Sequence, residues 1–119
     1  MRRVRVRNTT RRVVLGDRIG LADTRWLRLR GMLGRPEPEE GEGLLIHPSR
    51  AVHMYGMRYA LDVIFLDEDG RVEALYPGLA PGSRSSVHRS ARYALEVPVG
   101  TIEASGTQEG DRLEWTNKS

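Results

Sequence analysis

The chain has 119 residues, a formal net charge of +3 and no cysteine. A chain of this length can bury one hydrophobic core, so we expect a single domain over residues 1–119. The lack of cysteine excludes disulfides, thiol nucleophiles and thiolate metal sites. No apolar run is long enough to span a bilayer, and the arginine-rich residues 1–12 lack the apolar stretch of a secretion signal, which favours a soluble cytoplasmic protein.

Positive charge is concentrated in the first third of the chain. Residues 1–35 carry a net charge of +9, and residues 36–119 carry −6. Such an excess can attract an acidic partner such as nucleic acid. Valine and arginine alternate over residues 3–7, however, which places the arginines of a strand on a solvated face. Zinc ligands, RNP aromatics and a helix-turn-helix pattern are also missing, so we do not favour nucleic acid as a partner.

The first predicted elements are two short strands and a helix. Residues 2–7 alternate and predict an edge strand, and RRVVLG at 11–16 predicts a second strand. A short helix is expected over residues 23–31, capped by Asp23 or Thr24. Three large apolar residues of this region recur at helical spacing, so we expect them to line one buried face. They are Trp26, Leu29 and Leu33.

The rest of the chain predicts short strands separated by turn residues. They are GLLIH at 43–47, AVHMY at 51–55, LDVIFL at 61–66, RVEALY at 71–76, YALEVPV at 93–99, TIEAS at 101–105 and DRLEW at 111–115. Many short strands with one helix are typical of a mainly β protein, an antiparallel sandwich or barrel. The polar loop at 77–90 is long enough to border a functional site.

Asp62 is unusual because the strand at 61–66 is apolar on both faces. A buried carboxylate must be hydrogen-bonded, paired or protonated. The nearby partners are the backbone amides of the turn at 53–58 and the side chains of Arg50, His53 and Arg58. In the purely structural alternative, Asp62 caps the turn at 55–59.

Glu96 raises the same question in the strand at 93–99. If this strand neighbours the strand at 61–66, Glu96 could face Asp62 across a cleft, and such a pair can divide into an acid and a base. The simpler alternative is a glutamate on a solvated face.

The histidines and methionines predict no metal site. The three histidines show neither an HxH nor an HExxH spacing, so we expect no metal and no cofactor. Met54 and Met57 lie beside Tyr55 and Tyr59. Such residues either fill a core or line an apolar pocket.

Three blocks carry a family resemblance: RLRGMLGR, GLLIHPSRAVHMYGMRYALDVIFLDEDGRV and ALEVPVGTIEASGTQEGDRL. In this order, over roughly residues 9–115, they resemble the bacterial and archaeal family called domain of unknown function 192, or uncharacterised protein family 0127. The matching positions are Arg30 to Arg35, His53, Met57, Leu61, Asp62, Leu95, Glu96 and Gly100. Ala60 stands where the family usually has proline. The resemblance implies a jelly-roll-like antiparallel β-sandwich or barrel with one short helix, and it implies no activity.

Three functions are compatible with these residues. The first, which we favour, is a binding module whose concave site holds a small polar ligand or a peptide. The residues of this site are His53, Met54, Tyr55, Met57, Arg58, Asp62 and Glu96. The second is a hydrolase-type enzyme with Asp62 and Glu96 as acid and base, assisted by His53. The third is a nucleic-acid or protein interaction module in which the arginine-rich N-terminal strand pairs with a partner by edge addition.

Overall fold

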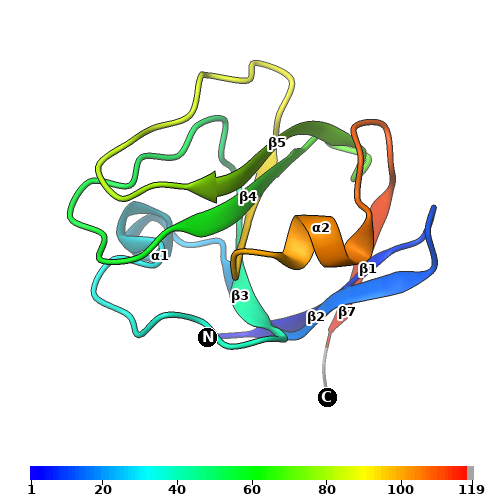
Figure 1. Cartoon of the computed structure of the whole chain (residues 1–119), viewed down its shortest axis with the longest axis horizontal. Coiled ribbons are helices and arrows are strands. Elements are labelled where there is room, and N and C mark those ends of the chain that lie inside the picture. The colour runs from blue at the N-terminus through cyan, green and yellow to red at the C-terminus, as the bar shows by residue number, and fades with distance from the viewer. Residues whose placement is uncertain (118–119) are drawn as a thin grey trace.

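The computed structural model describes residues 1–117, which form one seven-stranded sheet and two short helices (Figure 1). The mainly β fold and the helix near residues 23–31 are confirmed. Neither helix in residues 1–117 is long and apolar enough to cross a membrane. The elements are β1 (Arg3–Asn8), β2 (Val13–Ala22), α1 (Arg25–Arg30), β3 (Glu42–Ile46), β4 (Leu61–Leu66), β5 (Val72–Leu79), β6 (Tyr93–Val97), α2 (Thr101–Ser105) and β7 (Leu113–Asn117).

The sheet curls into a partial barrel. Its strand order is β5-β4-β6-β3-β2-β1-β7, and every neighbouring pair is antiparallel except β2 and β3. Where β5 begins, the Val72 amide donates to the Asp111 carbonyl at 2.8 Å, and the Leu113 amide donates to the Gly70 carbonyl at 2.8 Å. These bonds join the two outer strands of the sheet at one end, so the curl is closed there.

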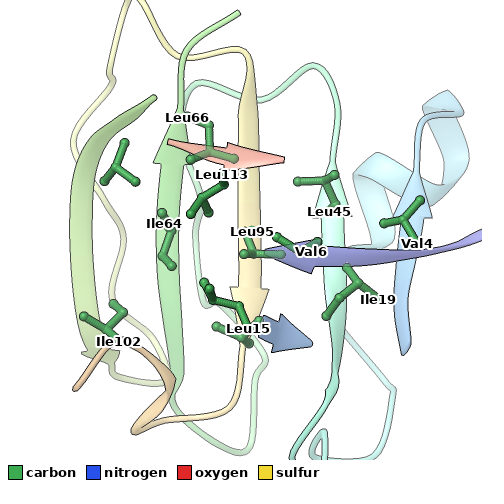
Figure 2. Close-up of a cluster of buried hydrophobic side chains, with 12 residues drawn as sticks. Val4, Val6, Leu15, Ile19, Leu45, Ile64, Leu66, Leu95, Ile102 and Leu113 are labelled. Carbon is green, nitrogen blue, oxygen red and sulfur yellow. The ribbon is translucent and has the colours of Figure 1, made fainter. Parts of the chain in front are cut away.

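Apolar side chains cover both faces of the central strands. One cluster fills the inside of the curl, where Ile64 of β4 and Leu95 of β6 meet Val6 of β1 (Figure 2). A second cluster lies on the other face and includes Val63, Phe65 and residues of the segments that follow α1 and β3. All six residues of β4 are buried as a result, which explains why its sequence shows no polar face.

The structure corrects two predicted strands. Residues 101–105 form helix α2 because Gly100, at a φ of 100°, turns the chain into a helical start. Residues 51–55 form no strand, and only His53 makes a bridge, with Arg84. Both segments have alternating apolar residues, but the backbone bonds of a strand require a neighbour that neither segment has over its full length.

The prediction of β1 as an edge strand is also wrong. β1 lies between β2 and β7 and pairs with both, which leaves β5 and β7 as the outer strands. Edge addition of a partner to β1 is therefore blocked by the chain's own backbone.

Helix α1 begins as expected but presents its apolar residues to solvent. The Thr24 hydroxyl caps it by accepting from the Leu27 amide at 3.2 Å. The exposed fractions of Trp26 and Leu29 are 68% and 70%, and Leu33 is exposed as well, so the predicted buried face is wrong. Helical spacing shows which side chains share a side, but Leu27 and Met32 are the residues that pack on the second cluster.

We predict that Trp26→Ala leaves the fold intact. Because the indole is mostly in water, the free energy of unfolding should change by less than about 0.5 kcal/mol. Phe65→Ala is the control, since Phe65 is fully buried and its loss should cost about 3–5 kcal/mol. Urea unfolding followed by circular dichroism measures both, and a loss above about 2 kcal/mol for Trp26→Ala would mean that the indole packs against the protein in solution.

Candidate binding site

Asp62 is a structural carboxylate, held inside the curl and 1% exposed. Its Oδ1 accepts a hydrogen bond from the Gly78 amide at 2.8 Å, and its Oδ2 accepts from the Gly100 and Ile102 amides at 3.2 and 2.9 Å. These bonds tie the end of β5 and the first turn of α2 to β4. The prediction that Asp62 caps the turn at 55–59 is wrong, because all three partners lie later in the chain.

Glu96 is the second buried carboxylate, and its environment differs. It is 4% exposed and pairs with Val63 of β4 and Leu44 of β3, so it faces the second apolar cluster. Burial raises the pKa of Glu96 to about 7. Within residues 1–117 its Oε1 atom has no hydrogen-bond partner. The expectation of a solvated glutamate is thus wrong, since α1 and the loops cover this face.

The two carboxylates do not form an acid–base pair. β4 and β6 are neighbours, as the prediction required, but Asp62 pairs with Val97 whereas Glu96 pairs with Val63. Directly paired residues share a face and adjacent residues alternate, so Asp62 and Glu96 lie on opposite faces of the sheet. The hydrolase prediction required a cleft with both carboxylates facing it, and their placement on opposite faces of the sheet excludes such a cleft.

A cavity of about 90 Å³ lies beneath α1 and is lined in part by Glu96. It brings together five of the seven predicted site residues: His53, Met54, Tyr55, Met57 and Glu96. Arg58 instead lines an adjoining groove of about 550 Å³, and Asp62 lies on the far face of the sheet. Met54 is almost fully buried and also serves the core.

The other residues of the cavity wall were missed as site residues, among them Arg28, Leu29 and Leu33. The sequence predicts that Arg28 contacts solvent or a carboxylate, and that Leu29 and Leu33 lie on the buried face of the helix. These residues reach the cavity because of the arrangement of the elements. α1 lies at one side of the sheet together with the loops that follow β3 and β5 (Figure 1). Only this long-range arrangement brings α1 and β6 together, and no local pattern marks it.

Hydrogen bonds hold the loops around the cavity in place. The Tyr59 hydroxyl donates to the Arg35 carbonyl at 2.9 Å, which fixes the segment after α1. The Met54 amide donates to the Ser83 carbonyl at 2.7 Å, which joins the two long loops. The His53 and Tyr55 rings stack with centroids 4.9 Å apart. The wall is therefore largely preformed.

The histidines are dispersed over the fold. His47 stacks on Tyr93, and His88 lies 2.7 Å from the Tyr76 hydroxyl, whereas His53 lines the cavity. Across residues 1–117, no group of three His, Cys, Asp or Glu side chains is placed to hold a metal ion.

The curled sheet with its two short helices places the protein among small, mainly β proteins. The chain belongs to the family domain of unknown function 192 (DUF192), described as "Uncharacterized ACR, COG1430", whose model matches residues 5–115. This confirms the resemblance drawn from the sequence blocks.

Known relatives agree with this assignment. A UPF0127 protein of Thermococcus sibiricus is 32% identical over 113 residues, which cover 91% of this chain and 72% of the relative. A crystal structure of a protein of unknown function from Novosphingobium aromaticivorans matches with a TM-score of 0.78 and 26% identity, covering 95% of this chain and 84% of that one. A candidate transcription regulator from Sinorhizobium meliloti matches with a TM-score of 0.76 and 27% identity, covering 96% and 92%.

Proposed function

We propose that this protein is a binding module that holds a small polar ligand in the cavity beneath α1, with Glu96 accepting a hydrogen bond from the ligand. The observation that carries the proposal is the buried Oε1 of Glu96, which has no partner within residues 1–117. Buried carboxylate oxygens are almost always hydrogen-bonded, so an orphaned one requires an explanation.

The same sheet contains the contrasting case. Asp62 is buried to a similar degree, and backbone amides satisfy both of its oxygens. A carboxylate kept for the fold is thus fully bonded in this protein, whereas Glu96 keeps one oxygen free beside a cavity. Burial of such a group opposes folding, which is typical of a position retained for binding.

The wall of the cavity fits the same function. Leu29, Leu33, Tyr55 and Met57 supply apolar surface around a single buried acceptor. Ligand sites commonly combine a mostly apolar wall with a few polar groups that fix orientation. The cavity of about 90 Å³ has room for a small polar group, and the rest of the ligand would lie on the exposed side chains of α1.

The test uses simple probes that differ in their ability to donate. We expect millimolar methylammonium and acetamide to shift the backbone amide resonances of Gly31 and Met57, and tetramethylammonium, which has no N–H to donate, to leave them unchanged. Glu96→Leu should abolish these shifts because it removes the acceptor. Glu103→Gln, an exposed change on α2, is the control and should preserve them.

Two results would contradict the proposal. One is that neither donor perturbs Gly31 or Met57 at any concentration tested. The other is that both donors shift these resonances equally in wild type and in Glu96→Leu. Chemical shifts elsewhere in the sheet show whether Glu96→Leu keeps the native fold.

A further inference from the structure

Two buried polar side-chain atoms in residues 1–117 have no hydrogen-bond partner, and their residues line the same cavity. They are Oε1 of Glu96 on β6 and Nε of Arg28 on α1. The ion pairs found in this part of the chain do not join the two side chains to each other. The residues that line the cavity therefore include one unused acceptor, on β6, and one unused donor, on α1.

The chemistry of these atoms restricts the ligand. A carboxylate accepts and cannot donate, and a guanidinium donates and cannot accept. A ligand that satisfies both must carry a donor and an acceptor close together. Opposite charges on the ligand strengthen both bonds, because charge-assisted hydrogen bonds are about twice as strong as neutral ones.

We infer, building on the proposed function, that the ligand is a free α-amino acid with an apolar side chain. Its ammonium group donates to Glu96, and its carboxylate accepts from Arg28. The side chain lies on Leu29, Leu33 and Met57, which form the apolar part of the wall. The head group of an amino acid carries both charges on one carbon, which suits a cavity of about 90 Å³.

A neutral amide such as a peptide backbone fits less well. It also donates and accepts, but it leaves the carboxylate and the guanidinium without counter-charges in a desolvated site. None of the ion pairs in residues 1–117 involves Glu96. Arg30 and His53 line the cavity, Tyr59 lies at the adjoining groove, and none of them is paired with Glu96.

Isothermal titration calorimetry at pH 8 with four probes tests this assignment. The probes are L-leucine, 3-methylbutylamine, 4-methylpentanoate and N-acetyl-leucinamide. We expect leucine to bind at least tenfold more tightly than each of the other three, because only leucine satisfies both charged groups. Arg28→Met should weaken leucine binding at least tenfold and leave binding of the amine unchanged.

Arg25→Met is the matched control, since Arg25 is an exposed arginine on the same helix and does not line the cavity. It should leave the affinity for leucine unchanged. The thermal midpoint of Arg28→Met should equal that of wild type, which excludes unfolding as the cause of lost binding.

The outcomes separate this inference from the proposed function. If the amine binds as tightly as leucine and Arg28→Met has no effect, the amino acid is excluded while Glu96 remains a ligand acceptor. If N-acetyl-leucinamide binds most tightly, the ligand is a peptide, and the inference is wrong. If no donor probe binds, the inference and the proposed function fail together.

Discussion

Replacing Asp62 by asparagine is expected to lower the free energy of unfolding by about 2–4 kcal/mol at pH 7. The carboxylate accepts three backbone hydrogen bonds, from Gly78, Gly100 and Ile102. An asparagine keeps one oxygen and turns an NH₂ group towards amides that also donate. Bonds to a charged acceptor contribute about 1.5–3 kcal/mol, and a buried amide left unpaired costs about 1–3 kcal/mol.

Denaturant unfolding at pH 7 measures this loss, with Asp17→Asn as the control. Asp17 is exposed and forms only a surface ion pair with Arg18, at 3.6 Å. Its replacement should change the free energy of unfolding by less than about 0.5 kcal/mol. An unchanged or raised stability of Asp62→Asn would show that the fold does not need the charge, and Asp62 would return as a candidate site residue.

The second prediction is a substitution that raises the free energy of unfolding. Glu96→Gln should raise the free energy of unfolding by about 2 kcal/mol at pH 8. Burial raises the pKa of Glu96 from 4.5 to about 7, so the folded protein at pH 8 carries the full cost of ionising a buried carboxyl. That cost is about 3 kcal/mol, and a glutamine recovers part of it because its own amide is also buried.

The gain in stability of Glu96→Gln over wild type should develop between about pH 4.5 and pH 7. The pKa of Glu96 in the unfolded chain is about 4.5. Below that pH, Glu96 is protonated in both the folded and the unfolded state, so no ionisation cost lowers the stability of the protein. As pH rises towards 7, the unfolded chain ionises first, and wild type loses stability that Glu96→Gln retains. The advantage of Glu96→Gln should therefore be largest above pH 7. At or below pH 4.5 the variant should be about 1 kcal/mol less stable than wild type, because its buried amide is a cost at every pH. Glu103→Gln, the exposed control, should show no such trend.

Urea titrations of wild type and Glu96→Gln between pH 4.5 and 8 measure this window. If Glu96→Gln is several kcal/mol less stable than wild type at pH 8, the carboxylate has a charged partner in solution. Arg28 and Arg30 are the arginines on the cavity wall that could supply it. The free acceptor on which the proposed function depends would then be lost.

The sequence predicts the local elements well and their partners poorly. The strand at residues 61–66 follows from a short apolar run bounded by turn residues, and the helix after Thr24 follows from capping. Both signals depend on neighbouring residues alone. The partners of Asp62 lie at Gly78, Gly100 and Ile102. No local pattern identifies amides so distant in the chain, so the partners predicted for Asp62 near residues 53–58 are wrong.

In the candidate site, too, residues that are close together in the sequence were predicted, whereas the residues of α1 were not. His53, Tyr55 and Met57 were predicted from a short cluster of side chains that suit a pocket, and the structure places them at one cavity. Arg28 was not predicted, because its place beside Glu96 depends on how α1 lies on the sheet. Periodicity also misassigned Trp26, since it cannot show which side of a helix the sheet covers.

The position of β1 has a consequence for how the chain reaches its fold. β1 can pair with β2 as soon as both have been synthesised, but its other neighbour is β7, more than 100 residues further along. Until β7 docks, one side of β1 exposes unpaired backbone groups that a second chain can match. Pairing between such distant segments is slow because a long loop must first close. Newly made chains are thus most prone to associate through β1, the strand that is sealed on both sides once folding is complete.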